Sequence, residues 1–335
     1  MKTVKLGATG ITVNKVGFGV LPIQRIPMGE AVYLLRKAFK NGIDFYDTAR
    51  AYTDSEEKIG AALSDVRDNI VIASKTMAAD AEGFWEQLKT SLEYLKCGYI
   101  DIYQFHNPPF LPKPGDGSGL FEAMLEAREK GLIRHIGITN HRYHVAIEAV
   151  ESGLYETLQF PVNYLSTGRE IEIIDLCRER GVGFIVMKAM SGGLISSSAA
   201  SCAFYNQYDN ALPIWGIQRE AELDEFISYI DMPPQLDDRL NEVINKDRQE
   251  LAGEFCRSCG YCLPCPKDID IPQAARMSLL LRRAPAASFL TEEWQAKMNM
   301  IDNCSGCNHC KEHCPYGIDI PELLKTNLKD YLTFL

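Results

Sequence analysis

Eight of the eleven cysteines lie in two closely spaced runs toward the end of this 335-residue chain. The first run is Cys256-x2-Cys259-x2-Cys262-x2-Cys265 and the second is Cys304-x2-Cys307-x2-Cys310-x3-Cys314, each followed by a proline. The second run matches the bacterial iron–sulfur spacing without departure. Three thiolates two residues apart can hold one cubane cluster because the backbone between them turns around it. The spacing therefore predicts two [4Fe-4S] centres.

The two runs indicate an internal duplication. The last cysteine of each run opens a similar phrase, CPKDIDIPQAAR at 265–276 and CPYGIDIPELLK at 314–325, as expected of a two-site module. The first run is one residue shorter before its final cysteine, which affects how Cys265 reaches its cluster. Disulfides and zinc are the alternatives. A cytosolic chain with thiols this close favours metal over disulfides, and zinc favours two separated C-x2-C pairs around one ion.

A second group of reactive side chains stands at the ends of short apolar runs earlier in the chain. Its members are Asp47, Thr48, Tyr52, Lys75, His106, Thr139, Asn140, Gln159, Asn163 and Lys188. Each alone has a structural explanation, such as capping a helix or lying solvated in a loop. Together, a carboxylate, a phenol, an amine and an imidazole around one rim form a set of groups able to transfer protons.

These side chains depend on a unit that repeats between residues 16 and 231: a short Val- and Ile-rich run, a polar turn and a segment with helical periodicity. The alternation predicts parallel strands covered by helices. The predicted strands are 16–20, 43–49, 69–75, 100–106, 133–140, 157–163, 183–189 and 211–217, and the predicted helices include 29–42, 84–98, 120–131 and 170–181. Eight strand–helix pairs favour a closed (β/α)8 barrel, an α/β fold whose reactive groups lie at the C-terminal ends of the strands.

Three further segments complete the expected organisation. Residues 4–16 alternate around a Gly-containing turn and predict a β-hairpin over the N-terminal face of the barrel. Residues 107–119 are rich in Pro and Gly and predict a loop. No strand is predicted after the linker at 230–238. We therefore expect a barrel domain over residues 1–231 and a small all-α domain over residues 232–335.

The net charge and the hydropathy of the chain limit the classes of partner that it is expected to bind. The chain has 35 basic and 45 acidic side chains, a formal charge of -10 at pH 7. This charge gives no support for binding to nucleic-acid phosphates or to an anionic membrane. No apolar run approaches the ~20 residues of a membrane-spanning helix, and the first residues lack the apolar stretch of a secretion signal. We expect a cytoplasmic protein with a small-molecule ligand.

The segments around the predicted rim resemble those of the aldo-keto reductases. The matching segments are YDTARAYTDSE (46–56), IASK (72–75), YQFH (103–106), HIGITN (135–140) and LQFPVN (158–163), in the same order. The resemblance covers almost all of the predicted barrel. It implies that Tyr52 donates a proton to a substrate carbonyl, assisted by Lys75 paired with Asp47. It also implies that His106 binds the carbonyl oxygen and places it.

The same resemblance implies a nicotinamide cofactor, NADP(H). Thr139, Asn140 and Gln159 fit the positions that hold the carboxamide, with Thr in place of the more frequent Ser. Met187 or Lys188 stands where the family has an aromatic residue that stacks on the nicotinamide. A thioether also packs on a ring, but with a smaller surface.

The segment PIWGIQREAELDEF at 213–226 corresponds to the part of the family that binds the adenosine half of the cofactor. Gly216, Gln218 and Arg219 fit a turn that cradles the 2′-phosphate, and Arg suits a bidentate grip on it. Phe226 stands where the family has an asparagine that contacts adenine.

The cysteine-bearing domain resembles the α-helical ferredoxin domains of larger redox enzymes. Their precedent groups Cys256, Cys259, Cys262 and Cys314 around one centre, and Cys304, Cys307, Cys310 and Cys265 around the other. The whole chain resembles the iron–sulfur-containing aldo-keto reductase-like oxidoreductases. This implies NADP(H)-dependent redox chemistry on a small carbonyl or alcohol, electron transfer through the clusters, and a redox protein as a further partner. The alternative is a redox-sensing or electron-carrying protein whose barrel binds a metabolite without turnover.

Overall fold

The computed structural model describes residues 2–166, 168–251, 255–283 and 286–335. Backbone contacts divide the chain into two compact units. The first comprises residues 1–189 and 199–240, and the second comprises residues 190–198 and 241–335.

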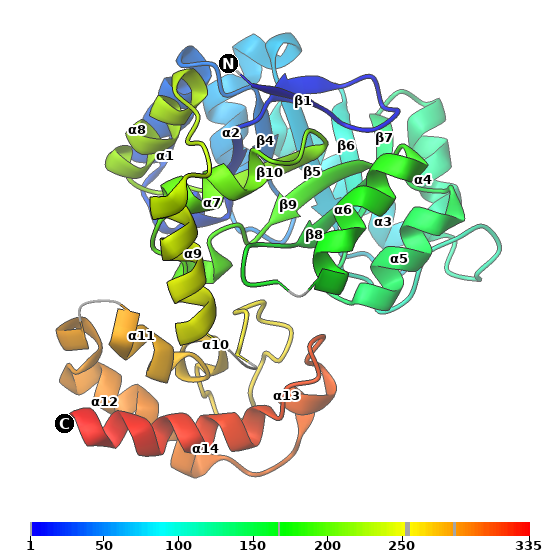
Figure 1. Cartoon of the computed structure of the whole chain (residues 1–335). Coiled ribbons are helices and arrows are strands. Elements are labelled where there is room, and N and C mark those ends of the chain that lie inside the picture. Colours follow the sequence, from blue (N-terminus) through cyan, green and yellow to red (C-terminus); the bar gives the residue numbers. More distant parts are fainter. Residues whose placement is uncertain (1, 167, 252–254, 284–285) are drawn as a thin grey trace. The chain divides into compact units, whose positions relative to one another are not determined.

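The first unit is built around a closed barrel of parallel strands (Figure 1). In order around the barrel, the strands are β10 (Ala211–Gly216), β3 (Gly17–Gly19), β4 (Phe45–Asp47), β5 (Val71–Thr76), β6 (Ile100–His106), β7 (Ile133–Thr139), β8 (Thr157–Pro161) and β9 (Gly183–Met187). Each coincides with a predicted strand to within a few residues, so the predicted (β/α)8 barrel is confirmed. The strands read as nearly continuous apolar runs because parallel strands under helices are buried on both faces.

Helices follow the strands and cover the outside of the barrel (Figure 1). They are α1 (Met28–Lys40), α2 (Ser55–Leu63), α3 (Ala81–Leu95), α4 (Leu120–Glu129), α5 (Tyr143–Ser152), α6 (Gly168–Arg180), α7 (Ser198–Tyr205) and α8 (Glu220–Asp231), with 3-10 turns η1 (Leu21–Arg25) and η2 (Ser64–Asn69). The pattern of α1 shows why they form: Ala31, Leu34, Leu35 and Ala38 recur at helical spacing and are buried. Residues 107–119 form the predicted loop between β6 and α4.

The predicted hairpin is formed by β1 (Thr3–Lys5) and β2 (Thr12–Asn14), which pair antiparallel. Its apolar residues Val4, Leu6 and Val13 join one buried cluster with barrel residues such as Phe45 and Leu212. Gly7 in its turn has φ +53°, and a Cβ there would lie 2.2 Å from the carbonyl oxygen of Gly181. Only glycine fits this close approach.

The second unit is helical. Its elements are η3 (Ser191–Gly193), most of α9 (Asp238–Glu250), α10 (Ile271–Ala274), α11 (Met277–Arg283), η4 (Ala286–Phe289), α12 (Glu292–Asn299), η5 (Met300–Asn303), α13 (His309–Glu312), α14 (Ile320–Tyr331) and η6 (Leu332–Phe334). Helix α14 packs against α10, α11, α12 and α13 (Figure 1). None of the described residues after 216 is in a strand, as the sequence predicts.

The duplicated phrases fold alike. Asp270 caps α10 and Asp319 caps α14, and each side chain accepts a hydrogen bond from a backbone N–H of the first turn. A proline follows in the first turn of both helices, where its missing N–H costs nothing.

The contact-based division differs from the expected domain boundary in two places. It falls after Leu240, inside α9, whereas the sequence places the boundary after residue 231. Residues 190–198, which directly follow β9 in the chain, group with the helical unit. In the parts of the chain with assigned structure, no helix is both long and apolar enough to cross a bilayer.

Candidate active site and cluster-binding cavity

The carboxyl ends of neighbouring strands bring the predicted proton-transfer residues to one rim of the barrel. Asp47 ends β4, Lys75 lies one residue before the end of β5, and His106 ends β6. The strand register aligns His106 with Thr139, and Thr139 with Gln159. Because all these strands are parallel, their reactive side chains share the face on which such barrels build their active sites.

A buried ion pair joins Lys75 to Asp47. The Lys75 Nζ donates to Asp47 Oδ1 at 2.7 Å and to the carbonyl oxygen of Thr48 at 2.5 Å. The side chains are 1% and 3% exposed. Burial lowers the pKa of Lys75 and raises that of Asp47, while the opposite charge of each partner counters both shifts. Water does not screen this pair, so the amine is held firmly in one place.

Tyr52 lies in the turn between β4 and α2, next to that amine. The Lys75 Nζ is 5.2 Å from the centroid of the Tyr52 ring. The His106 imidazole meets the same ring edge-on, with centroids 5.7 Å apart. The fold therefore brings together the four residues for which the sequence predicts a catalytic role.

The imidazole of His106 is neutral at physiological pH. Burial, followed by the charge of Lys75, lowers the pKa of His106 to about 3. Within the described chain, its Nδ1 is buried without a hydrogen-bond partner. A neutral imidazole donates through one nitrogen only, so His106 can hydrogen-bond a carbonyl oxygen without protonating it.

A second ion pair, between the partly buried Arg50 and the buried Glu56, lies at the Tyr52 turn, and sequence reasoning missed it. Arg50 donates to Glu56 and, at 3.1 Å, to the carbonyl oxygen of Thr53. Glu56 also accepts from Ser74 Oγ at 2.5 Å. The available signal was the periodicity of α2, which places Glu56 on the same face as the buried Ile59.

Buried amides extend the network around Asp47. Gln104 Nε2 donates to Gln159 Oε1 at 3.0 Å, and Gln159 Nε2 lies 3.4 Å from Asp47 Oδ1. The sequence did not single out Gln104, although strand alternation places it on the same side of β6 as His106. The side chain of Gln159 is therefore engaged at both ends within the barrel.

The other residues predicted to hold the nicotinamide lie close to this network. Thr139 Oγ1 is 3.8 Å from the sulfur of Met187, which ends β9. Lys188 follows with φ 60°, in the left-handed region, and its carbonyl oxygen accepts from Asn163 at 3.1 Å. Thr139 and Met187 thus lie side by side.

Asn140 is fully buried, and its side chain hydrogen-bonds the backbone of two loop residues. Its Nδ2 donates to the carbonyl oxygen of Pro108 at 2.8 Å, and its Oδ1 accepts from the backbone N–H of Arg142 at 2.8 Å. The side chain must therefore exchange one of these bonds to hold a carboxamide.

The predicted phosphate turn is occupied by a carboxylate of the chain itself. Gly216 ends β10, and Arg219 is the residue that caps α8. The backbone N–H groups of Gln218 and Arg219 donate to Glu222 Oε2 at 3.0 and 3.1 Å. The guanidinium of Arg219 donates to Glu222 Oε1 at 2.8 and 2.5 Å. The backbone N–H groups of Gln218 and Arg219 and the guanidinium of Arg219 are thus paired with Glu222 in this structure.

Phe226 belongs to the core. It is 5% exposed, and its ring stacks on Trp215 with centroids 4.6 Å apart and planes inclined by 22°. The residue that replaces the adenine-contacting asparagine therefore packs inward against its own barrel.

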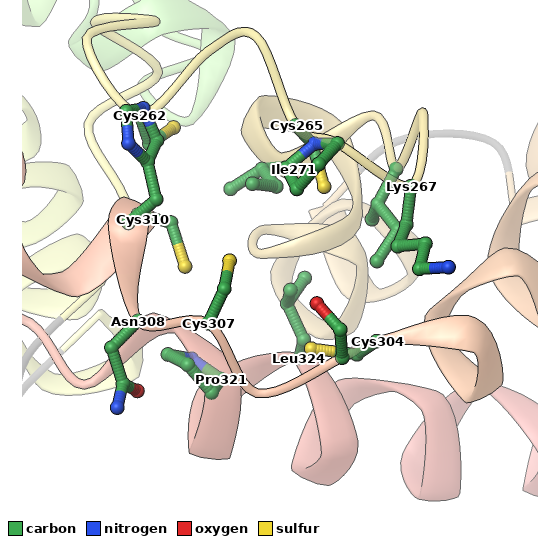
Figure 2. Close-up of a pocket in the computed structure, with 14 residues that line it drawn as sticks. Cys262, Cys265, Lys267, Ile271, Cys304, Cys307, Asn308, Cys310, Pro321 and Leu324 are labelled. Carbon is green, nitrogen blue, oxygen red and sulfur yellow. The ribbon is translucent and has the colours of Figure 1, made fainter.

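In the helical unit, cysteines from both runs line one cavity (Figure 2). Its walls contain Cys262, Cys265, Cys304, Cys307 and Cys310. Figure 2 shows Cys265 and Cys307 facing the cavity from opposite sides. Four of these thiols are one complete predicted ligand group, and Cys262 comes from the other.

The cavity fits a polynuclear cluster by its donors, since thiolates are the ligands that iron–sulfur clusters use. Apolar side chains, including Ile269, Ile271 and Leu324, line the same space. In the part of the chain that the structure describes, no three His, Cys, Asp or Glu side chains converge on a point suited to a single metal ion. The thiols instead line one shared cavity.

The loop that carries Cys256 lies beside residues 190–198. The backbone N–H of Ser258 donates to Cys256 Sγ at 3.4 Å. Arg276, which is 4% exposed, donates to the carbonyl oxygen of Gly192 at 2.5 Å. A Cβ on Gly192 would lie 3.7 Å from Cβ of Ser258. The segment after β9 is thus packed against a predicted cluster-binding loop.

Comparison with known proteins assigns both parts of the chain. Residues 15–207 match the Aldo/keto reductase family, and residues 255–319 match the 4Fe-4S dicluster domain. L-galactose dehydrogenase of Arabidopsis thaliana is 28% identical over 210 residues, covering 57% of this chain and 66% of that protein. The NADH-specific methylglyoxal reductase of Escherichia coli is 26% identical over 231 residues, covering 59% and 70%. The chain therefore spans about two thirds of the length of these relatives.

Solved structures show the same fold. An aldo-keto reductase from Bacillus halodurans in its holo form aligns with a TM-score of 0.64 and 21% identity, covering 74% of this chain and 96% of that one. An aldo-keto reductase from Klebsiella pneumoniae in complex with NADPH aligns with a TM-score of 0.62 and 20% identity, covering 74% and 95%.

Proposed function

Because this chain belongs to the aldo/keto reductase family and carries a 4Fe-4S dicluster domain, we propose that it is an oxidoreductase that interconverts a small carbonyl compound and its alcohol with a nicotinamide cofactor. The observation that carries the proposal is the buried Lys75–Asp47 pair, held beside the ring of Tyr52 and near the neutral His106. A structural role alone does not require this combination of an acid, an amine, a phenol and an imidazole at one rim.

The four side chains have separate tasks. Tyr52 gives its phenolic proton to the carbonyl oxygen of the substrate. Lys75 stabilises the phenolate that remains, because a nearby positive charge favours the charged form of an acid. Asp47 keeps Lys75 oriented, and His106 donates a hydrogen bond that positions the carbonyl. A bound nicotinamide supplies or accepts the hydride.

Several residues would hold that cofactor. Thr139, Gln159 and Met187 lie at the same rim as the catalytic group, and the amide of Asn140 is one exchanged hydrogen bond away from them. The hydroxyl of Thr139 and the amides of Asn140 and Gln159 are groups of the kind that bind a carboxamide, once the amides exchange the bonds that they make within the barrel. The cofactor of two relatives is consistent with this, since one is named NADH-specific and another was solved with NADPH.

The dicluster domain gives the enzyme a second redox route. We propose that its two [4Fe-4S] clusters, held by the two groups of four cysteines, carry single electrons between the barrel and a redox protein. A nicotinamide exchanges two electrons together, so the partner has to convert between the two kinds of transfer, as a flavoprotein does. A reducing cytoplasm suits this chemistry, because it keeps the eight thiols free of disulfides.

Two measurements test the proposal. Correctly placed acid–base assistance contributes about 10²–10⁴ in rate, so Tyr52→Phe should lower the carbonyl-dependent oxidation of NADH or NADPH by a factor in that range. Equal rates in wild type and variant would remove Tyr52 as proton donor. Anaerobically purified protein should contain about eight iron and eight sulfide per chain. Colourless protein with stoichiometric zinc would contradict the cluster assignment.

A second candidate is a redox-sensing or electron-carrying protein whose barrel binds a metabolite without turnover. It is favoured by the inward-packed Phe226 and by Glu222, which occupies the predicted phosphate turn. Cluster-loaded protein that binds a dinucleotide, yet shows no turnover with any of a panel of small aldehydes, ketones and alcohols, would favour this candidate over the enzyme.

A further inference from the structure

Two arginines of the helical unit bond the segment that follows β9, residues 190–198. Arg276 Nη1 donates to the carbonyl oxygen of Gly192 at 2.5 Å. Arg283 Nε donates to the carbonyl oxygen of Leu194 at 2.8 Å. Hydrogen bonds from a charged donor are stronger than those between neutral groups. The two guanidinium groups therefore fix the segment at two carbonyl oxygens, two residues apart.

Both arginines are themselves fixed by bonds that do not involve the segment. Arg276 is 4% exposed, and its Nη2 donates to Gln273 Oε1 at 3.0 Å. The side chain of Arg283 is 10% exposed and donates to Asp247 at 2.5 Å and to Glu250 at 2.6 Å. A planar guanidinium that is already oriented loses little freedom when it bonds one more acceptor. The segment is therefore bonded to a rigid support.

The backbone of the segment has a conformation that requires such support. Ser191, Gly192 and Gly193 have φ angles of 50°, 64° and 95°, all in the left-handed region, and Lys188 shortly before them has φ 60°. Residues other than glycine persist in this region only where the surrounding contacts fix them. The bond from Arg276 to Gly192 lies inside this run of positive φ angles.

The same run begins at the proposed nicotinamide site. Met187 ends β9 beside Thr139, and the carbonyl oxygen of the next residue, Lys188, accepts from Asn163 at 3.1 Å. Ala189 alone separates Lys188 from the segment. A change in the φ and ψ angles after Ala189 redirects the chain that leaves the nicotinamide site.

We propose that Arg276 and Arg283 are positioning residues for the nicotinamide cofactor. By holding the segment, they keep Met187 and Lys188 in the conformation that binds the dinucleotide. This role rests on the proposed use of a nicotinamide cofactor and assigns part of its binding to the helical unit. If only a fraction of the molecules has the competent conformation, the affinity for the ligand falls by that fraction.

Two variants of the full, cluster-loaded chain each remove one donor. Arg276→Gln removes the guanidinium that bonds Gly192. Arg283→Lys removes the Nε–H that bonds Leu194 and keeps a positive charge for Asp247. The iron content of each variant is measured first. If Arg276→Gln loses iron, Arg283→Lys decides the test, because it preserves the charge of the site.

The matched control is Arg282→Gln, which changes the neighbouring arginine of α11. Arg282 bonds Asp330 at 2.6 and 2.8 Å, within the helical unit. Wild type and all variants are titrated with NADH and with NADPH by calorimetry. Backbone amide hydrogen exchange is measured over residues 187–198, which reports on the segment independently of any cofactor.

Arg276→Gln and Arg283→Lys should each weaken binding of the dinucleotide that wild type prefers by about tenfold, the equivalent of about 1.4 kcal/mol. This corresponds to a competent conformation in about a tenth of the molecules. Amides of residues 187–198 should exchange faster in both variants. With a carbonyl substrate, the KM for the dinucleotide should rise while kcat stays near that of wild type, because the lost interaction contributes equally before and during the reaction. Arg282→Gln should match wild type in every measurement.

Three results would overturn the proposal. Equal affinity and equal exchange in all four proteins would remove the role of the two arginines and leave the proposed function intact. An equal loss of affinity in all three variants would assign the effect to the stability of the helical unit. Wild type that binds neither NADH nor NADPH would overturn the proposed function together with this role.

Discussion

Replacing Arg50 with methionine should destabilise the barrel and slow catalysis, although Arg50 touches no predicted reacting group. Its guanidinium joins Glu56 to the carbonyl oxygen of Thr53, the residue after Tyr52. Thr53 has φ 38°, in the left-handed region, so its conformation depends on such a contact. Arg50→Met removes the contact and leaves the carboxylate of Glu56 buried beside Ser74.

The magnitude follows from burial. The side chains of Arg50 and Glu56 are 17% and 1% exposed. Removing one partner of a buried pair costs about 3–5 kcal/mol, and the partial exposure of Arg50 places the expected loss of unfolding free energy at about 3 kcal/mol. In the double variant Arg50→Met with Glu56→Gln, no charge is left uncompensated, so the loss should shrink to about 1–1.5 kcal/mol.

The assay is urea unfolding, followed by near-ultraviolet circular dichroism, together with turnover kinetics. The matched control is Arg36→Met, which breaks an exposed pair with Asp65; because water screens that pair, this variant should lose far less stability than Arg50→Met. A displaced Tyr52 should lower kcat by about tenfold with little change in KM, which corresponds to about 1.4 kcal/mol in the transition state. The reasoning is refuted if Arg50→Met and Arg36→Met lose the same stability, or if the double variant is no more stable than Arg50→Met.

Three further predictions concern other parts of the chain. The pKa of His106 is lowered to about 3 in the folded protein and is about 6.5 in the unfolded chain, so the unfolded state binds more protons between these two pH values. The free energy of unfolding should therefore be highest above pH 6.5 and fall on acidification, by up to about 2 kcal/mol at pH 5. If His106→Asn loses as much stability in acid as wild type does, another group is responsible. Cys307→Ser, in the cavity wall, should lower the iron content from about eight to about four atoms per chain, whereas Cys97→Ser, outside both runs, should leave the iron content unchanged. A loss of iron in both variants or in neither contradicts the ligand assignment. Gly7→Ala should lower the melting temperature of the barrel, because its Cβ would lie 2.2 Å from the carbonyl oxygen of Gly181. The control Gly10→Ala measures the backbone cost alone, since Gly10 has φ +79° but no atom within 4 Å of an added Cβ. Identical melting temperatures of the two variants would show that the hairpin moves to accommodate the methyl group.

The order of elements, and the rim at which the proposed catalytic residues meet, could be predicted from the sequence because both depend on regular spacing. The short, nearly continuous apolar runs of β5 and β6 predict buried parallel strands. The C-terminal ends of parallel strands share one face of the barrel. Lys75 and His106 therefore had to lie at the same rim as Asp47. The duplicated Asp–Ile–Pro phrases likewise predict two similar helix starts, because each carries its own cap.

Hydrogen bonds between side chains that are distant in the sequence follow no regular spacing along the chain. The sequence shows an arginine and a glutamate in REAELDEF and in YDTARAYTDSE alike, but which donors converge on which carboxylate depends on rotamers and on the neighbours that exclude water. The burial of Glu56 against Ser74 and the grouping of residues 190–198 with the helical unit are likewise products of packing.

The sequence by itself thus determined the barrel, the rim that holds Tyr52 and Lys75, and the thiols spaced for two clusters, because each of these is encoded in local spacing. Only the tertiary structure decided that the phosphate turn expected at Arg219 is filled by Glu222. Spacing places a donor in a turn, but only the folded arrangement of charges decides whether that donor remains available to a ligand.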